Sequence, residues 1–202
     1  MHVAGILLAA GAGTRMGRNK MLLAIEGETL LRRAARGALS AGLDPVIVVL
    51  GHEADRAAAE LAGLGCRTRV NAGYEKGVNT SLSAGVEAIP PEAEAAVVLL
   101  ADMPFVGPDL IRAVLARYRE TGAPVVTARY GEVTAPPTLY HRAVFPELVG
   151  GEGEGRGREV VRRHRAEIVC VDRSPGELAD VDFAEDWERA RTRLAAGGGH
   201  DR

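Results

Sequence analysis

The sequence predicts an α/β protein of three αβα layers, in which helices cover both faces of a doubly wound, mostly parallel sheet. Three observations carry this prediction. Short apolar runs alternate with longer amphipathic stretches along the chain. The first run, residues 3–8, leads into a glycine-rich segment, and the strongest run, residues 95–100, is followed by Asp102. Because ligands bind beyond the carboxyl ends of strands in such sheets, we look for function in the loops that follow them.

Each expected strand is a short apolar run, and each expected helix is an amphipathic stretch between two such runs. Thr29 is placed to cap the first helix and Gly42 to end it. Pro136 and Pro137 predict that their strand lies at a sheet edge. The expected strands are residues 3–8, 45–50, 67–70, 95–100, 124–128, 136–140 and 167–171. The expected helices are residues 30–39, 53–62, Thr80 or Ser81 to Pro90, 108–119, 143–148, 158–164 and 182–194.

Composition predicts one globular domain over residues 1–195 and a loose tail over residues 196–202. Hydrophobic residues make up 47% of the chain and charged residues 26%. The formal net charge of -2, without a long basic stripe, argues against nucleic acid as a partner. Cys66 and Cys170 form no zinc pattern. The first apolar run is too short to span a membrane and has no basic lead, so we expect a soluble, cytoplasmic protein.

The glycine-rich segment after the first strand carries the strongest functional signal. Gly11, Gly13 and Gly17 let the backbone approach a ligand closely, and successive exposed N–H groups favour an anion. Arg15 offers a planar fork of donors and Lys20 a mobile point charge. Together they are suited to neutralise a triphosphate. The alternative is a tight strand–helix turn with incidental surface cations.

A dinucleotide site is the main competing interpretation of this segment. Its fingerprint is Gly-x-Gly-x-x-Gly opening directly into a helix, whereas here the third glycine comes one residue late. Gly51 and His52 stand at the end of the second strand, where an acidic residue would hold a ribose. A Rossmann-type oxidoreductase that binds NAD is therefore the more distant alternative, and a non-catalytic cofactor carrier is another.

Residues 8–20, followed by Met21-Leu22-Leu23, resemble the signature of the MobA-like nucleotidyltransferases and look closest to the molybdenum cofactor cytidylyltransferases. Residues 77–82, 100–104 and 180–182 with Asp186 match further segments in the same order. The resemblance implies a Rossmann-like nucleotidyltransferase fold. It also implies that a nucleoside monophosphate is joined to a phosphorylated acceptor and that pyrophosphate is released.

Carboxylates at two points of the chain are candidate metal ligands. Asp102 follows the strongest strand, and Mg²⁺ is usually held by one or two carboxylates together with substrate phosphates. The resemblance implies that Asp102 and Asp182 bind Mg²⁺ and that Asp180 supports them. Spacing alone equally favours Asp182 as the cap of the last helix, with Glu185 three residues later as in a capping box.

The resemblance also implies which residues contact the nucleotide. Arg15, Lys20 and Asp102 are the expected catalytic residues. Ala10 favours CTP, because related guanylyltransferases usually have glycine at that position. The expected nucleotide-binding residues are Ala9, Ala10, Gly11, Gly13, Arg15, Gly17, Lys20 and Ser81.

The acceptor side departs from the family pattern. Molybdopterin is the favoured acceptor, with transient contact to a molybdoenzyme or its chaperone. However, residues 150–157 have glutamate where the cytidylyltransferases have aspartate. That segment is either a loop without a role or, through Arg156 and Arg158, part of a site for an anionic acceptor. A guanylyltransferase of the same family, or a transferase with another phosphorylated acceptor, stays an alternative.

Overall fold

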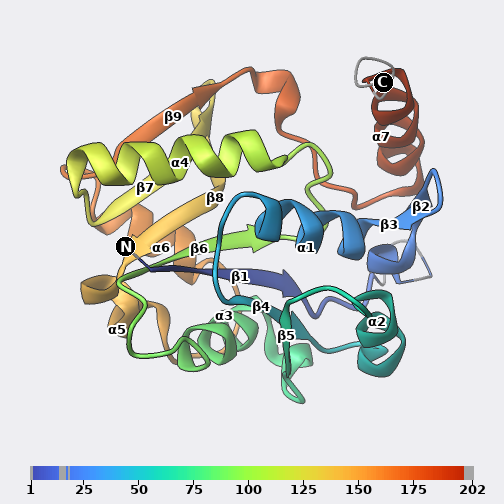
Figure 1. The fold of residues 1–202 in the computed structure, drawn as a ribbon, viewed down its shortest axis with the longest axis horizontal. Helices are drawn as coiled ribbons and strands as arrows, with labels where there is room; N and C mark the ends of the chain where they lie inside the picture. The colour runs from blue at the N-terminus through green and yellow to red at the C-terminus, as the bar shows by residue number, and fades with distance from the viewer. Residues whose placement is uncertain (1, 14–16, 18, 198–202) are drawn as a thin grey trace.

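The computed structural model describes residues 2–13, 17 and 19–197. Seven strands form one sheet in the order β5-β4-β1-β6-β8-β7-β9 (Figure 1). Within it β8 runs antiparallel to both of its neighbours, and the other pairs are parallel. The strands are β1 (Val3–Ala9), β4 (Val46–Leu50), β5 (Arg67–Val70), β6 (Ala95–Leu100), β7 (Val125–Tyr130), β8 (Val133–His141) and β9 (Val169–Arg173). A doubly wound, mostly parallel sheet is confirmed.

Helices pack on both faces of the sheet because alternate strand residues point to opposite faces. In β1, Val3 and Leu7 join a core with α1 (Leu30–Ser40), α2 (Ala54–Glu60) and α4 (Pro108–Thr121). Ala4 and Ile6 join a second core with α3 (Val78–Glu87), α5 (Phe145–Leu148) and α6 (Arg156–Arg163). The two cores give the three expected layers (Figure 1).

The register of the central strands brings three loops to one edge of the sheet. Leu8 of β1 is level with Leu100 of β6, and Ala9 is level with Leu50 of β4. The segments that follow β1, β4 and β6 therefore meet at the carboxyl ends of the strands. In that region the motifs from Gly11 to Asp102, which are far apart in the sequence, lie around one cavity.

The expected edge position of the strand that contains Pro136 and Pro137 is wrong, because β8 lies between β6 and β7. The pairing of β7 with β8 shifts register between Thr127 and Ala128, opposite the two prolines. On the other side, the pairing of β6 with β8 covers residues 138–141 of β8. The prolines thus lie at an irregularity where a ladder hydrogen bond is not required of them.

Several boundaries differ from the sequence expectation. A small hairpin of β2 (Ala24–Ile25) and β3 (Glu28–Thr29) precedes α1 and was not expected. Helix α3 begins at Val78 rather than at Thr80 or Ser81. Helix α7 (Ala184–Gly197) reaches two residues into the segment expected as a loose tail, and residues 198–202 lie outside the described residues.

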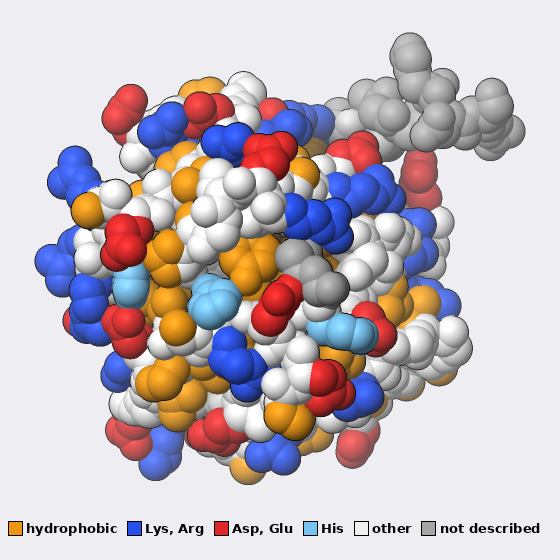
Figure 2. Space-filling view, turned by 60° about the vertical axis from the view of Figure 1, so that its left-hand side comes forward, with side chains coloured by type: hydrophobic (Ala, Val, Ile, Leu, Met, Phe, Trp, Pro, Cys, Tyr) orange, Lys and Arg blue, Asp and Glu red, His pale blue; other side chains and the backbone are white. Residues whose placement is uncertain are grey.

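The face of the molecule in Figure 2 has side chains of both charges. On the face that Figure 2 shows, Lys and Arg side chains are interspersed with Asp and Glu. Among the described residues, no helix is both long enough and apolar enough to cross a membrane.

Candidate active site

Among the residues that the structure describes, the glycine-rich loop after β1 leads first to a short helical turn that begins at Lys20. It passes through Gly13 and Gly17, both with positive φ, to a short 3-10 helix, η2 (Lys20–Leu22). Only after the β2–β3 hairpin does α1 begin, at Leu30. Since a dinucleotide fingerprint needs the glycines at a helix start, this path argues against that interpretation. The predicted catalytic residue Arg15 lies outside the described residues.

Asn19 fixes the end of this loop, and the sequence motif did not single it out. Its side chain is buried, with Oδ1 accepting a hydrogen bond of 3.0 Å from the N–H of Met21. Its Nδ2 donates to the carbonyl of His52 at 3.4 Å. A polar side chain immediately before the expected cation was the available signal, because Asn commonly caps such turns. Asn19 thereby caps η2 and fixes the backbone position from which the Lys20 side chain extends.

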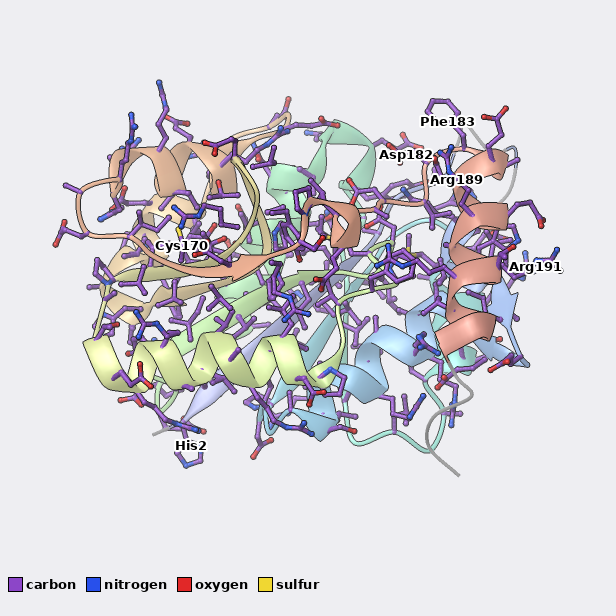
Figure 3. All side chains as sticks on the ribbon, turned by 90° about the horizontal axis from the view of Figure 1, so that it is seen from above. His2, Cys170, Asp182, Phe183, Arg189 and Arg191 are labelled. Atoms are coloured by element: carbon purple, nitrogen blue, oxygen red, sulfur yellow. The ribbon has the colours of Figure 1, made fainter. Side chains whose placement is uncertain are left out.

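Lys20 joins the loop after β1 to two carboxylates from distant parts of the chain. Its Nζ lies 2.6 Å from Oδ2 of Asp102 and 2.8 Å from Oδ1 of Asp182. Asp102 follows β6, and Asp182 lies next to the start of α7, at the opposite end of the molecule from Cys170 (Figure 3). Burial alone lowers the pKa of Lys20, but the charge of Asp102 and the hydrogen bonds to Asp102 and Asp182 outweigh it and raise that pKa. Lys20 is therefore held as a cation.

Asp180 completes the acidic cluster around Lys20. Burial raises the pKa of Asp180 to about 6, and the nearby charges of Asp102 and Asp182 act in the same direction. The N–H of Val181 donates to the carbonyl of Asp102 at 3.1 Å, which anchors this segment beside the end of β6. The end of β6 and the segment of residues 180–182, which are distant in sequence, thus lie side by side.

Asp186 accepts hydrogen bonds from the backbone at the start of α7. The helix begins at Ala184, and Asp186 rather than Glu185 turns back to its start. Oδ2 of Asp186 accepts hydrogen bonds from the N–H groups of Phe183 at 2.8 Å and of Asp182 at 3.2 Å. The carboxylate of Asp182 itself pairs with Lys20.

The acidic cluster around Lys20 suits a metal ion that is bound jointly by protein carboxylates and a ligand's phosphates. It does not suit a metal ion that is bound by protein side chains alone. Within the described part of the chain, no group of three or more His, Cys, Asp and Glu side chains is arranged to hold a metal. Asp102 and Asp182 nevertheless converge on one positive charge, the Lys20 ammonium. Two carboxylates facing a cation are the donor set that Mg²⁺ takes when phosphate oxygens and water supply the remaining ligands.

A cavity of about 520 Å³ adjoins this cluster and contains most of the predicted nucleotide-binding residues. Gly13 and Gly17, which were also predicted, do not line it. Its polar wall includes Glu75 and Glu154, which the sequence did not point to. The predicted residues that line it are Ala9, Ala10, Gly11, Lys20, Ser81 and Asp102.

The loop after β1 packs closely against the loop after β4 at Ala10, which lines this cavity. The N–H of His52 donates to the carbonyl of Ala10 at 3.1 Å. A Cβ built on Gly51 would lie 2.7 Å from that carbonyl oxygen and 2.7 Å from the Tyr74 side chain. Glycine is thus required at position 51 for contact between the loops, so an acidic side chain does not fit at that position.

Asn71 orients the predicted Ser81. Nδ2 of Asn71 donates to Oγ of Ser81 at 3.0 Å and to Oγ1 of Thr80 at 2.8 Å. Ser81 is only 3% exposed, so its hydroxyl is held in a defined direction where it lines the cavity. Asn71 follows the weak strand β5, and nothing in its sequence context had marked it.

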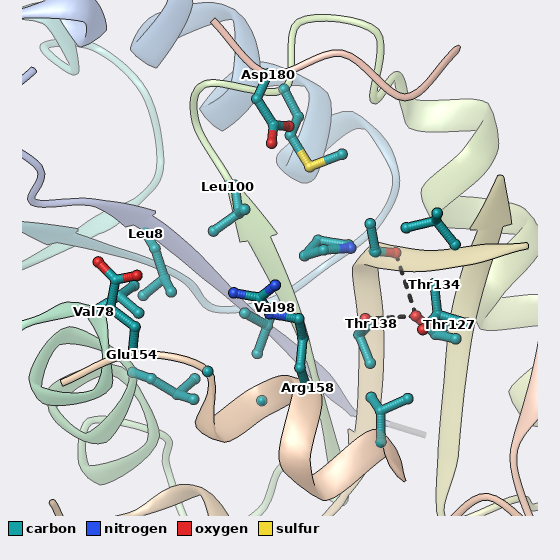
Figure 4. Close-up of a pocket in the computed structure, with 18 of the residues that line it drawn as sticks. Leu8, Val78, Val98, Leu100, Thr127, Thr134, Thr138, Glu154, Arg158 and Asp180 are labelled. Carbon is teal, nitrogen blue, oxygen red and sulfur yellow. Dashed lines mark hydrogen bonds between the residues drawn. The ribbon is translucent and has the colours of Figure 1, made fainter. Parts of the chain in front are cut away.

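A second cavity, of about 350 Å³, adjoins the first and is largely apolar (Figure 4). The two cavities share Leu8, Val78, Leu100 and Glu154 as lining residues. At the far wall Thr127 and Thr138 are buried and joined by a hydrogen bond of 2.7 Å. Two ligands, one in each cavity, would therefore be neighbours.

The glycine-rich segment of residues 150–157 forms one rim of the second cavity and is tied to the start of α3. The N–H of Asn79 donates to the carbonyl of Gly153 at 3.0 Å, and its Nδ2 donates to the carbonyl of Glu152 at 3.1 Å. Oδ1 of Asn79 accepts from the N–H of Arg156 at 3.0 Å. These three hydrogen bonds hold the backbone of residues 152–156 against the start of α3.

Comparison with known proteins decides the family. Residues 5–168 match the MobA-like NTP transferase domain. The chain belongs to this family. The matched range includes the glycine-rich loop, α3 and Asp102, and it ends before Asp180 and Asp182. The chain is therefore a member of a nucleotidyltransferase family.

Three relatives span almost the whole chain. It is 31% identical over 206 residues to the purine catabolism protein PucB of Bacillus subtilis (strain 168), covering 96% of this chain and 98% of the relative. It is 31% identical over 199 residues to nicotine blue oxidoreductase of Paenarthrobacter nicotinovorans, covering 93% and 95%. It is 29% identical over 201 residues to molybdenum cofactor guanylyltransferase of Rhodobacter capsulatus, covering 96% and 97%.

The crystal structure of Rv0371c from Mycobacterium tuberculosis H37Rv has the same fold. It is 28% identical, with a TM-score of 0.84, and covers 95% of this chain and 98% of that one. A second structure of Rv0371c is a complex with manganese, again 28% identical, with a TM-score of 0.78 and coverage of 95% and 99%. The sheet and helices described above are those of the Rossmann-like nucleotidyltransferases.

Proposed function

We propose that this protein transfers the cytidylyl group of CTP to the phosphate of molybdopterin and releases pyrophosphate. The observation that carries the proposal is the pair of adjoining cavities, one lined by the glycine-rich loop with Lys20 and Asp102 and the other largely apolar. A reaction that joins two substrates requires two such neighbouring sites.

The chemistry needs no general base. A phosphate oxygen of the acceptor, already ionised near neutral pH, attacks the α-phosphorus of the nucleotide. The bond from that phosphorus to the oxygen bridging to the β-phosphorus breaks, and pyrophosphate leaves with the electron pair. Catalysis then consists of positioning and of neutralising charge in the first cavity.

Lys20 and Ser81 are proposed to contact different parts of the nucleotide. The cationic Nζ of Lys20 is positioned to neutralise phosphate oxygens. The buried hydroxyl of Ser81, oriented by Asn71, is positioned to hydrogen-bond the nucleotide. Arg15 is proposed to act with Lys20 on the departing phosphates.

We propose Mg²⁺ as the metal, held by Asp102 and Asp182 with Asp180 in support. When bound, the metal would neutralise negative charge on the phosphates. The manganese complex of Rv0371c supports a divalent cation in a related protein of this fold. The acidic cluster around Lys20 supports it in this one.

CTP and molybdopterin are proposed on different grounds. Ala10, which lines the first cavity, favours CTP. The Rhodobacter capsulatus relative is named a guanylyltransferase of the molybdenum cofactor, which supports the acceptor and makes GTP the competing donor. We place the reaction in the cytoplasm, where its product would pass to a molybdoenzyme or its chaperone.

An oxidoreductase is the second candidate, because one relative is named nicotine blue oxidoreductase. It predicts binding of NAD that does not depend on a divalent metal. Within the described residues, the first helical turn after β1 is η2, which begins beyond the glycines, and this favours the transferase.

Calorimetric titration separates these proposals. CTP, GTP, ATP and NAD would each be titrated into the protein with Mg²⁺, with Mn²⁺ and with a chelator. Metal-dependent binding that favours CTP supports the proposal, and a preference for GTP keeps the reaction but overturns the role of Ala10. Binding of NAD alone, with or without metal, rejects the transferase.

A further inference from the structure

Arg158 is a cationic side chain in a largely apolar cavity, and the proposed reaction does not use it. It extends from α6 into the second cavity, whose apolar lining includes Leu82 and Val98 (Figure 4). Arg156, the other arginine that the sequence suggested, lines neither of the two cavities. Its guanidinium instead lies against Gly151, where an added Cβ would be 2.3 Å from Nη2.

The charge of Arg158 is not neutralised within the described part of the chain. Glu154 and Asp180 are the acidic residues that line the same cavity, and neither lies within 4.0 Å of its guanidinium nitrogens as an ion pair. Arg158 also borders an open groove of about 740 Å³ on its other side. Five arginines and one glutamate line that groove: Arg117, Arg129, Arg158, Arg162, Arg165 and Glu132. Arg117 and Arg129 pair with Glu120 and Asp172. Among the described residues, Arg158, Arg162 and Arg165 have no ion pair, and these three charges favour an anion beside Arg158.

Arg158 lines the second cavity and not the cavity proposed to hold the reacting phosphate. The latter cavity contains Lys20 and Asp102, and Arg158 lines the groove as well. Figure 4 shows Arg158 and Asp180 reaching in from opposite sides. Asp180 belongs to the acidic cluster around Lys20, so the reaction takes place on the Asp180 side. An anion at Arg158 is therefore a different group from the phosphate that attacks.

We propose that Arg158 binds a second anionic group of the acceptor. The inference rests on the proposed transferase function and defines the acceptor class more closely. The acceptor is a phosphomonoester with a ring-shaped body that fills the second cavity and a further negatively charged group that is separate from the reacting phosphate. Arg158 acts as a specificity residue, because an acceptor without that charge leaves the guanidinium unpaired.

The test compares Arg158→Ala and Arg158→Lys with Arg162→Ala. Arg162 is a matched control, since it lies one turn later on the same helix and lines the groove but not the second cavity. Pyrophosphate release would be measured with CTP, Mg²⁺ and molybdenum-loaded molybdopterin as the acceptor probe. Binding of molybdopterin and of CTP would be measured separately by calorimetry, and melting temperatures would check the fold.

We expect Arg158→Ala to raise the KM for molybdopterin about 10- to 100-fold, the effect of removing a charged hydrogen-bond donor. The affinity for CTP should stay within about 2-fold, and Arg158→Lys should recover part of the loss. An unchanged KM for molybdopterin in Arg158→Ala overturns the inference. An equal rise in Arg162→Ala also overturns it, because the effect would then be a general attraction by the groove.

Binding distinguishes this inference from the proposed function. If the wild-type protein binds molybdopterin but releases no pyrophosphate, the transferase proposal fails. The Arg158 inference would still be supported by a loss of molybdopterin binding in Arg158→Ala and overturned by unchanged binding. If the wild-type protein does not bind molybdopterin, the inference fails for this acceptor class even where CTP binds with Mg²⁺.

Discussion

The side chain of Lys20 joins three parts of the chain through two ion pairs. Lys20 follows the glycine-rich loop, whose end is fixed by Asn19, and it pairs with Asp102 after β6 and Asp182 before α7. Its side chain is only 12% exposed, so water screens these pairs less than pairs on the surface. The same ammonium group faces the cavity proposed for the nucleotide.

Lys20→Met is expected to reduce the rate of pyrophosphate release about 100- to 1000-fold, as when one electrostatic contact to a developing charge is removed. Lys76 is the matched control, because it is the only other lysine in the sequence and pairs with Glu152 at the surface. Initial rates with CTP, Mg²⁺ and molybdopterin measure the effect. A Lys20→Met rate equal to that of Lys76→Met would remove Lys20 from the mechanism.

Glu147 supplies a prediction about pH and stability. Its carboxylate accepts from Nε2 of His164 at 2.8 Å and from Nη1 of Arg163 at 2.5 Å. The hydrogen bond from His164, and then that from Arg163, lower the pKa of Glu147 below 4.5 against the opposing effect of burial. The stability from this pair is therefore complete above pH 4.5 and is lost as the pH falls through the lower folded-state pKa.

Urea unfolding at about pH 5 and about pH 3 tests this sign. The wild-type protein should lose more unfolding free energy between these two values than Glu147→Gln loses, by about 1 kcal/mol. Other carboxylates titrate in both proteins, so the difference reports Glu147. An equal loss in the two proteins would contradict the pKa direction.

At the scale of elements, the start of α3 is joined to the segment of residues 150–157. Gly77 precedes α3 with φ of 109°, and a Cβ there would lie 2.3 Å from the carbonyl oxygen of Gly153. Asn79 adds the hydrogen bonds to Glu152, Gly153 and Arg156 described above. This contact joins the rims of both cavities, because Val78 and Glu154 line each of them.

Gly77→Ala should lower the unfolding free energy by about 1–3 kcal/mol through backbone strain, with a further loss from the displaced segment. Gly153→Ala is the matched control, since its φ is also positive, at 84°, but nothing lies within 4 Å of its Cβ position. Urea unfolding of both variants isolates the contact. A loss for Gly77→Ala no larger than that for Gly153→Ala would show that the contact contributes nothing.

The sequence predicted most elements because their apolar patterns are long and regular. It missed the β2–β3 hairpin, whose two-residue strands carry no periodic signal. It misplaced β8 because Pro136 and Pro137 are usually edge residues, whereas here a register shift accommodates them. Lys20, Asp102, Asp182 and Ser81 were predicted from motifs, but Asn19, Asn71 and Asn79 act through contacts that only the folded chain creates.

The whole molecule depends on the two cores that sandwich the sheet. Leu139 on β8 is fully buried in the core that includes α4. Leu139→Ala should reduce the unfolding free energy by about 2–5 kcal/mol, as other buried leucines do. Val133 on the same strand is 51% exposed, so Val133→Ala should change it by no more than about 0.5 kcal/mol. An equal loss of unfolding free energy for Leu139→Ala and Val133→Ala in urea would show that burial of Leu139 does not stabilise the fold.

The fold brings two cavities together at the carboxyl ends of β1 and β6, and the proposed function requires both. Pyrophosphate release is the most direct test, with CTP, Mg²⁺ and molybdenum-loaded molybdopterin in one reaction. The proposed function predicts that pyrophosphate and a cytidylylated product form in equal amounts, and that a chelator or the Asp102→Ala substitution abolishes both. Full pyrophosphate release by Asp102→Ala, or none by the wild-type protein with either CTP or GTP, would contradict the account.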